Sequence, residues 1–375
     1  MLLCQLITSP LFLLNKHAYN LYTVWAKGMV VLARIALTEY VCPCLIRVSG
    51  DVSVQGQIQL MSDGRLKTDF PERLVLIANH QTTLDGSFVW WSAYTNGVHG
   101  HIIVILKDSL KSIPILGLAM KLYGFIFLAR KWEVDKSRLE SGLKRLIAHS
   151  HLRPNPMWLI IFPEGTVLTP SSKNRSDNYA RRIGFRPLRN VLLPRSTGLF
   201  YCLKRLKSQA VLEWVYDCTL GYERSVKSPV TRIMLTKPAL SRNDSFPGLY
   251  YTFWSVFIQR RQPKEVNMHW RRYNMAEIPL GSQSEFEVWL RARWVEKDEL
   301  LDRFYRTGRF ATERTVSTSA DDKPQTVKAS MGYVETHARL SYAEKVKQTF
   351  IVWLGYLVVT QLAAIGVSAA KEAAM

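Results

Sequence analysis

A histidine and an aspartate follow the first strongly apolar run in the middle of the chain. His80 and Asp85 are five positions apart and come directly after the expected strand 74–78. In an open α/β sheet, side chains at the carboxyl end of a strand face the crevice where such folds bind ligands. The aspartate can accept a hydrogen bond from one imidazole nitrogen and leave the other as a base. The pair predicts a general base, although a histidine and an aspartate at this spacing are common.

Two further segments place an acid and an arginine at expected strand ends. Residues 162–166 read Phe-Pro-Glu-Gly-Thr, a tight turn that would present the Glu164 carboxylate and backbone N–H groups. The apolar run 125–128 leads to Arg130, whose planar guanidinium suits a phosphate. The simpler interpretations are a structural turn with a surface glutamate and an ion-paired surface arginine.

Taken together, these segments resemble the motifs of the glycerolipid acyltransferase (PlsC-type) family. The family has a His-x4-Asp block, an arginine block, a Phe-Pro-Glu-Gly-Thr block and a later proline block, here at 191–198. Residues 215–219 and 296–301 further resemble the eukaryotic branch that includes lysophosphatidic acid and lysocardiolipin acyltransferases. The resemblance runs from about Asn15 to Phe310. Val167 departs from it, because many relatives have a polar or charged residue there, so headgroup preference does not carry over.

The resemblance implies an acyl-CoA:lysophospholipid O-acyltransferase. An acyl-CoA thioester is already activated, so a base that deprotonates a glycerol hydroxyl is sufficient. His80 would be that base and Asp85 would orient it. Backbone N–H groups at the helix start after Asn79 are expected to stabilise the oxyanion. The expected substrate-binding residues are Asn79, Arg130 as the phosphate ligand, Glu164 as a hydroxyl-binding or loop-ordering group, Gly165 and Thr166.

The expected acyl acceptor is lysophosphatidic acid, with lysophosphatidylinositol and lysocardiolipin as alternatives. No metal site and no cofactor are expected, and acyl-CoA is a co-substrate. A non-catalytic membrane lipid-binding protein of the same fold is the alternative of another class. It would not need His80 and Asp85, and both are present. Nucleic-acid binding is not expected, because the sequence has no reader module and no basic residues interleaved with exposed aromatic side chains.

The net charge of the 375-residue chain is +20, and much of it is concentrated in one segment. Residues 170–209 contain ten Lys or Arg side chains and a single acid, Asp177. Such segments are attracted to anionic lipid surfaces, and the CoA phosphates and a lysophospholipid headgroup are anionic as well. A solvated basic face is the alternative interpretation. With 47% hydrophobic residues, the chain is not a disordered polycation.

These side chains need an α/β scaffold to position them. Apolar runs at 74–78, 102–106, 125–128, 157–162 and 210–216 alternate with helical patterns. Strands that are apolar throughout predict a mostly parallel or mixed sheet covered by helices on both faces. The resemblance implies that this is the glycerolipid acyltransferase fold, over residues 48–310. A late helix is expected to begin at Ser284, as a capping box with Glu287, and to end at Gly308.

The N-terminal segment is predicted to associate with a membrane. Residues 1–47 are mostly apolar, but Lys27, Arg34 and Glu39 would each be unfavourable at the centre of a bilayer. Helices that lie in the membrane interface are therefore expected rather than a clean transmembrane span.

The C-terminal segment is predicted to cross a membrane. Residues 311–345 are polar and predict a flexible linker, whereas 349–370 contain no charged residue and predict a transmembrane helix over 346–372. A buried core helix is the alternative. The endoplasmic reticulum membrane is the expected location, with the catalytic domain facing the cytosol; mitochondrial and other endomembranes are the alternatives.

Overall fold

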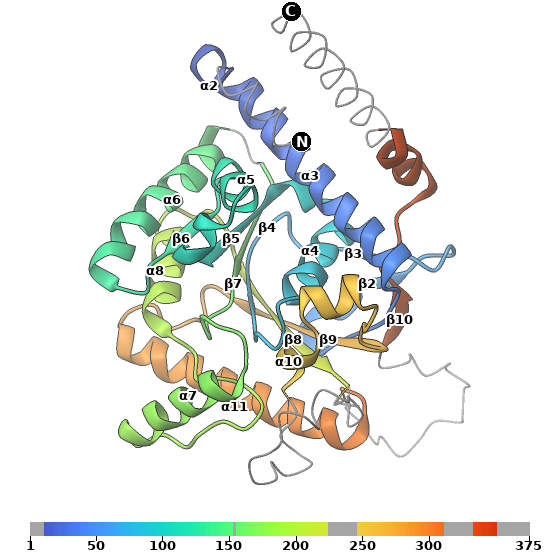
Figure 1. Ribbon diagram of the computed structural model, residues 1–375. Coiled ribbons are helices and arrows are strands. Elements are labelled where there is room, and N and C mark those ends of the chain that lie inside the picture. The colour runs from blue at the N-terminus through green and yellow to red at the C-terminus, as the bar shows by residue number, and fades with distance from the viewer. Residues whose placement is uncertain (1–10, 153–154, 224–245, 311–332, 351–375) are drawn as a thin grey trace, which may run out of the picture.

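A mixed eight-stranded sheet forms the centre of the molecule. We describe it from a computed structural model, for residues 11–152, 155–223, 246–310 and 333–350 (Figure 1). The strand order is β10-β1-β9-β8-β4-β7-β5-β6. The strands are β1 Leu45–Gly50, β4 Arg73–Ala78, β5 Ile102–Lys107, β6 Ile126–Leu128, β7 Met157–Ile161, β8 Trp214–Tyr222, β9 Glu265–Asn274 and β10 Val334–His337, and a separate hairpin pairs β2 Ile58–Leu60 with β3 Leu66–Thr68.

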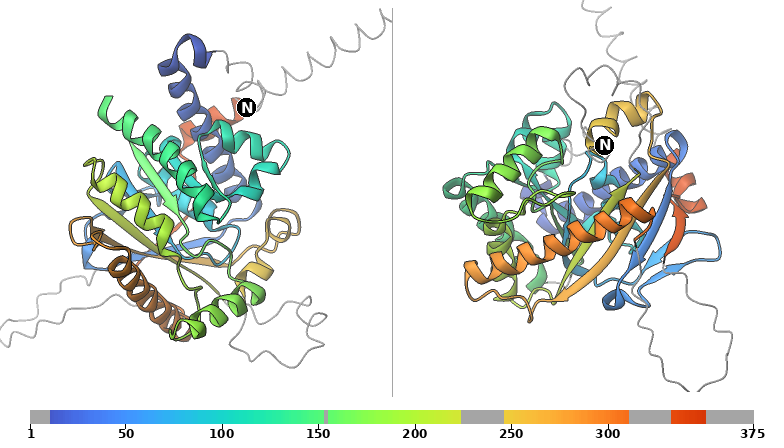
Figure 2. Two further views of the ribbon diagram at one scale, coloured as in Figure 1. Left: turned by 90° about the vertical axis from the view of Figure 1, so that its left-hand side faces the viewer. Right: turned by 90° about the horizontal axis from the view of Figure 1, so that it is seen from below.

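Helices cover both faces of this sheet, as two further views show (Figure 2). The α-helices are α2 Leu11–Leu14, α3 Lys16–Val41, α4 Asp85–Thr95, α5 Leu116–Leu122, α6 Trp132–Leu152, α7 Pro170–Arg182, α8 Ser196–Lys207, α10 Pro247–Tyr250 and α11 Gln283–Thr307. Single turns at Val52–Val54, His99–His101, Asp108–Ser112 and Trp254–Ile258 and a helix at 342–350 complete the described elements.

The alternation of side chains along β4 explains why the strand is apolar throughout. Leu74, Leu76 and Ala78 belong to the core that includes α3 and α4, whereas Val75 and Ile77 belong to the core that includes α6, α8 and α11. Successive side chains of a strand point to opposite faces, so a central strand covered on both sides has no polar position. The predicted α/β class with a mixed, helix-covered sheet is confirmed.

The parallel strands bring the predicted motifs to one edge. β4 pairs in parallel with both β7 and β8, and β5 pairs in parallel with both β7 and β6. Carboxyl ends of parallel strands meet on the same side of a sheet. The segments after β4, β6 and β7, which carry His80, Arg130 and Glu164, therefore converge. β9 runs antiparallel to β8 and begins the other half of the sheet.

Two expected elements have different bounds in the structure. The strand expected at 210–216 is β8, Trp214–Tyr222, so its second half was not predicted. The helix expected to start at Ser284 is α11, whose N-cap is Ser282: the Ser282 hydroxyl accepts the N–H of Glu285 at 3.2 Å. The predicted end at Gly308 is confirmed, with a left-handed φ of 75° that favours glycine.

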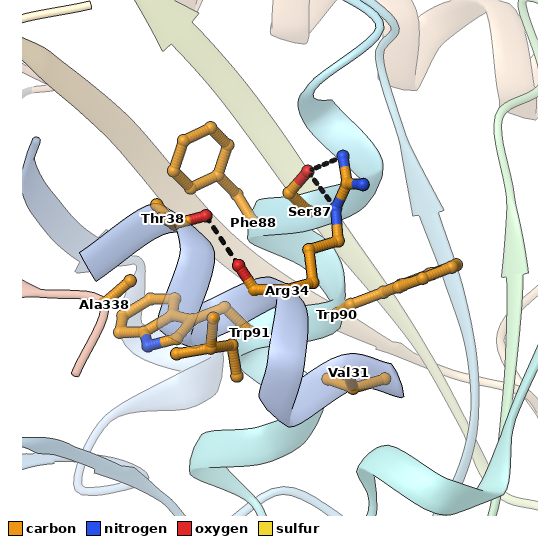
Figure 3. Close-up of a pocket in the computed structure, with 9 residues that line it drawn as sticks. Val31, Arg34, Thr38, Ser87, Phe88, Trp90, Trp91 and Ala338 are labelled. Carbon is orange, nitrogen blue, oxygen red and sulfur yellow. Dashed lines mark hydrogen bonds between the residues drawn. The ribbon is translucent and has the colours of Figure 1, made fainter. Parts of the chain in front are cut away.

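The expected N-terminal membrane segment is partly built into the domain. Among the described helices, α3 is the one long and apolar enough to cross a membrane, but its charged residues are used within the fold. Lys27 Nζ donates to the Ile102 carbonyl at 3.1 Å, and Arg34 Nε donates to Ser87 Oγ of α4 at 2.8 Å (Figure 3). The helix ends at Val41, and β1 then enters the sheet where helix was expected to continue.

Part of the expected linker at 311–345 is ordered. Val334–His337 forms β10, which pairs antiparallel with β1, and Glu335 forms an ion pair with Arg47 at 2.7 Å. β-branched residues in this stretch suit an edge strand, although the polar composition predicted a linker. Most of the expected transmembrane helix, from residue 351 onward, lies outside the described residues.

Candidate active site

His80 and Asp85 are in direct contact at the carboxyl edge of β4. His80 Nδ1 lies 2.9 Å from Asp85 Oδ2. The Asp85 side chain is fully buried at the first position of α4, whereas 22% of the His80 side chain is exposed. The strand thus ends in a histidine that faces the solvent, supported from behind by a carboxylate that solvent cannot reach.

The hydrogen bonds to Asp85 fix the tautomer of His80. Asp85 Oδ2 also accepts the backbone N–H groups of Gln81 at 2.6 Å and Thr82 at 3.0 Å, and Oδ1 accepts the hydroxyls of Thr82 at 3.0 Å and Tyr222 at 2.6 Å. An oxygen that already accepts two N–H groups is an acceptor toward the imidazole too. The proton therefore sits on Nδ1, and the neutral ring keeps a free lone pair on Nε2.

The Phe-Pro-Glu-Gly-Thr turn packs directly against His80. The Phe162 ring stacks on the imidazole with a centroid distance of 4.4 Å, and the Leu168 N–H donates to the His80 carbonyl at 2.8 Å. The Gly165 N–H closes the turn on the Phe162 carbonyl at 2.9 Å, with a φ of 71° at the glycine. The turn and the histidine are therefore held as one unit by ring stacking and backbone hydrogen bonds.

Glu164 points into the protein rather than toward solvent. Only 3% of the residue is exposed, and its Oε1 accepts the indole N–H of Trp294 from α11 at 3.3 Å. Oε2 has no hydrogen-bond partner within the described part of the chain. Burial raises the pKa of Glu164 to about 8, opposed in part by the Trp294 N–H. The contact with Trp294 is compatible with the loop-ordering role expected for this residue, and the binding of a substrate hydroxyl stays a prediction.

Three arginines gather beside the turn. The Arg130 guanidinium donates to the Gly165 carbonyl, and a Cβ added at Gly165 would lie 3.7 Å from Cδ of Arg195. Burial and the charges of Arg195 and Arg175 lower the pKa of Arg130. All three residues are exposed. An exposed cluster of guanidinium groups is suited to bind a phosphate. Within the described ranges, no group of three or more His, Cys, Asp or Glu side chains is arranged to hold a metal ion.

The remaining predicted site residues lie in different surroundings. Asn79 is fully buried, and its amide exchanges hydrogen bonds of 2.9 and 2.8 Å with the backbone of Leu220, so it joins β4 to β8; its role in substrate binding stays a prediction. Thr166 is half-buried in the turn. Of the backbone N–H groups after Asn79, among which donors for the oxyanion are expected, those of Gln81 and Thr82 bond to Asp85.

The two late stretches 215–219 and 296–301 meet in the core. Asp217 and Lys297 are both fully buried and form an ion pair of 2.5 Å, and Lys297 also donates to the Cys218 carbonyl at 3.0 Å. Arg271 lies 3.1 Å from the second oxygen of Asp217. Burial alone would raise the pKa of Asp217, but Lys297 and Arg271 together lower it. The next residue of α11, Asp298, accepts the N–H of Asn190 at 2.5 Å.

Several residues of the site were not predicted. Tyr222 comes from the second half of β8, which was not predicted from the sequence. Its place at the end of a strand parallel to β4 could have indicated that it lies near Asp85. Arg175 and Arg195 were noted only as members of the basic segment. Trp294 lies far along the chain from Glu164, and its apolar position on α11 gave no sign of a polar contact.

Comparison with known proteins agrees with this geometry. The family profile described as "Acyltransferase" matches residues 53–220, and the one described as "Acyltransferase C-terminus" matches residues 257–331. The first contains every predicted site residue, and the second contains α11.

Three relatives illustrate the range of the similarity. The 2-acyl-1-lysophosphatidylinositol acyltransferase of Saccharomyces cerevisiae is 32% identical over 354 residues, which cover 86% of this chain and 85% of the relative. Lysocardiolipin acyltransferase 1 of Gallus gallus is 32% identical, covering 80% of this chain and 68% of the relative. Probable 1-acyl-sn-glycerol-3-phosphate acyltransferase 5 of Arabidopsis thaliana is 34% identical, covering 66% and 58%. The chain therefore belongs to the PlsC-type glycerolipid acyltransferase family and is an acyltransferase.

Proposed function

We propose that the protein transfers a fatty acyl group from acyl-CoA to a free glycerol hydroxyl of an anionic lysophospholipid, with His80 as the general base. The observation that carries this proposal is the buried Asp85 carboxylate, whose hydrogen bonds orient a half-exposed His80 with its Nε2 lone pair outward. A structural histidine would not require an exposed nitrogen beside a phosphate-binding cluster. The family membership supports the same chemistry.

In the proposed reaction, His80 Nε2 first accepts a proton and later returns it. Nε2 removes the proton of the acceptor hydroxyl as its oxygen attacks the thioester carbonyl, and the imidazolium that forms is stabilised by Asp85. When the tetrahedral intermediate collapses, the carbon–sulfur bond breaks and Nε2 returns the proton to the CoA thiolate. Because the N–H groups of Gln81 and Thr82 already bond to Asp85, the oxyanion needs other donors.

The arginine cluster supports a phosphate-bearing acceptor. Arg130, Arg175 and Arg195 lie at the turn that contacts His80, so a glycerol phosphate held there would present a neighbouring hydroxyl to Nε2. Lysophosphatidic acid is the acceptor predicted from the sequence. Lysophosphatidylinositol is a second candidate, because a relative that aligns over 85% of its own length is named for that substrate; lysocardiolipin is a third.

A membrane location is part of the proposal. The exposed apolar residues at the start of α3 and on α2, such as Leu13, Leu14 and Leu21, support membrane association. We place the protein in the endoplasmic reticulum membrane with the domain in the cytosol, where acyl-CoA is available.

The first test is acyl transfer by membranes that contain the full chain. Labelled acyl-CoA is offered with lysophosphatidic acid, lysophosphatidylinositol and lysocardiolipin in parallel. His80→Ala should lower transfer by about 10²–10⁴-fold, whereas H17A, which changes an exposed histidine at the start of α3, should retain it. Equal transfer by H80A and the wild type would contradict the mechanism. Absence of transfer to any acceptor would favour the non-catalytic lipid-binding alternative.

A further inference from the structure

One surface segment beside the active site is amphipathic although it contains no long helix. It comprises α10, the π-helical turn Trp254–Ile258 and the chain up to Lys264. Tyr251, Val256 and Phe257 are 7%, 2% and 8% exposed and belong to the main core. On the opposite side, four large apolar residues are 51–63% exposed: Leu249, Phe253, Trp254 and Ile258.

The exposed residues are presented by an ordered scaffold. The Thr252 N–H donates to Ser255 Oγ at 2.9 Å, and the Ser255 N–H donates back to Thr252 Oγ1 at 3.1 Å. The Val256 N–H closes the turn on the Thr252 carbonyl at 3.0 Å. With Val256 and Phe257 anchored in the core, the exposure of Phe253 and Trp254 is a property of the fold and not of a loose loop.

The first turn of this segment, α10, packs against two motifs of the active site. A Cβ added at Gly248 would lie 2.8 Å from the Gln81 carbonyl oxygen and 2.8 Å from Val167 Cγ1. Gln81 follows the proposed base, and Val167 follows the Phe-Pro-Glu-Gly-Thr turn. The backbone of α10 therefore rests directly on both motifs, and this close approach requires a glycine.

A second apolar element projects on the same side of the molecule. Both views in Figure 2 place the gold segment with α10 and the teal helix α5 on one side. Ile115 and Leu116, at the start of α5, are 72% and 53% exposed. Arg34 of α3 also lies 5.9 Å from the ring centroid of Phe257, so the segment adjoins the N-terminal helix.

The charge around the segment indicates which partner it fits. Residues 246–264 contain no acid, and Arg260, Arg261 and Lys264 follow the apolar residues and are exposed. Tryptophan and phenylalanine next to basic side chains are typical of elements that lie at the boundary between acyl chains and anionic headgroups. A protein partner of ordinary composition would not require a flank without acids.

We propose that Leu249, Phe253, Trp254 and Ile258 insert into the interface of an anionic phospholipid bilayer, with Arg260, Arg261 and Lys264 against its phosphates. Insertion here holds the partly exposed His80 side chain close to the membrane surface, so that a lysophospholipid can reach it without passing through water. The consequence for lysophospholipid access rests on the proposed function, whereas the insertion of the four apolar residues does not.

The direct test uses an environment-sensitive fluorophore on the full chain. NBD is attached to W254C, with V288C on α11 as the control, because Val288 and Trp254 are 67% and 63% exposed. Cys4 is replaced by serine, and the other four cysteines are buried. The protein is reconstituted into phosphatidylcholine–phosphatidylserine vesicles with or without lipids brominated along their acyl chains.

We expect the W254C probe to shift its emission to the blue and to be quenched by the brominated lipids, with V288C unaffected. Quenching should weaken when phosphatidylserine is omitted. Equal behaviour of the two probes would overturn the proposal, even if α2, α3 or the C-terminal segment holds the protein on the vesicle.

A kinetic test separates docking from catalysis. F253S/W254S should transfer acyl groups several-fold more slowly to a long-chain lysophospholipid in vesicles, and at the wild-type rate to a short-chain acceptor dissolved in water; V288S should change neither rate. Equal loss with both acceptors would mean that the segment supports the site itself and would overturn the proposal. If the wild type acylates neither acceptor, the proposed function fails, and the quenching experiment still decides whether the segment inserts.

Discussion

Asp85 and Glu164 both lie next to His80 and both are buried carboxylates, but the fold treats them in opposite ways. Asp85 receives hydrogen bonds from two backbone N–H groups, two hydroxyls and the imidazole. Glu164 Oε1 accepts the indole N–H of Trp294, the backbone N–H groups of Leu192 and His80 also favour the charged form, and Oε2 has no hydrogen-bond partner in the described structure. Burial of a charge is unfavourable unless it is paired or hydrogen-bonded. The fold thus satisfies the Asp85 carboxylate with hydrogen bonds, whereas burial raises the pKa of Glu164.

The difference assigns different tasks to the two residues. A charged and fully bonded Asp85 can orient His80 and stabilise an imidazolium. Glu164, whose pKa is raised by burial to about 8, serves as a hydrogen-bonding link between the turn and α11. A third buried acid, Asp217, is kept charged in another way, by Lys297 and Arg271 in the core between β8 and α11.

The largest effect should come from removing the charge of Asp85. In D85N the amide oxygen can still accept from His80 Nδ1, but the imidazolium loses its counter-charge, so kcat should fall by about 10³-fold. D63N is the matched control, because Asp63 also accepts a backbone N–H but is on the surface. Acyl-transfer kinetics measure both. Retention of activity in D85N would make Asp85 a structural residue like Glu164.

An intermediate effect is expected where a buried charge loses its partner. Lys297→Met leaves Asp217 with Arg271 alone and should lower the free energy of unfolding by about 3–5 kcal/mol. K111M removes a half-exposed ion pair with Asp108 and should cost less than about 1 kcal/mol. Denaturant unfolding measures both. The double variant D217N/K297M should recover part of the loss, and failure to do so would mean that packing dominates over charge at this position.

The most gradual effect should be a change in the pH dependence of stability. The pKa of Glu164 is raised from 4.5 to about 8 in the folded state, so between these values the folded protein holds a proton that the unfolded chain has released. Stability should therefore fall as pH rises through this window, by up to about 1.4 kcal/mol per pH unit. E164Q should remove this component. E213Q, which changes an exposed glutamate, should leave this pH dependence unchanged. If the free energy of unfolding of E164Q and of the wild type changes with pH in the same way, Glu164 ionises normally and the prediction is wrong.

Local motifs made one half of the molecule predictable. The strands that end near His80, Arg130 and Glu164 are apolar throughout, because helices cover both faces, so they were identified together with the motifs that follow them. In β1 and β9, apolar residues alternate with polar ones, and β10 lies in a polar stretch. The pairing of these strands joins distant parts of the chain. No local pattern reports such pairing.

Two polar residues of the predicted site are buried in the structure for a common reason. Asn79 was expected to bind substrate, and Glu164 to bind a hydroxyl or to order its loop; the structure buries them against Leu220 and Trp294. Whether a polar side chain at a strand end turns inward depends on a partner supplied from far along the chain. The charged residues of α3 show the same effect, since Lys27 and Arg34 find their partners on β5 and α4.

The place of β1 in the sheet has a consequence for the order of folding. β1 lies between β9 and β10, and Leu45 pairs with Glu265. At about 5–20 residues per second, the ribosome needs roughly 10–40 s to extend the chain from one strand to the other. During that interval β1 has emerged while both strands that flank it in the sheet are still absent, and its apolar side chains are available to a chaperone or a bilayer. Non-local pairing of this kind also slows folding. The newly made N-terminal strand therefore meets its surroundings before it meets its partners in the sheet.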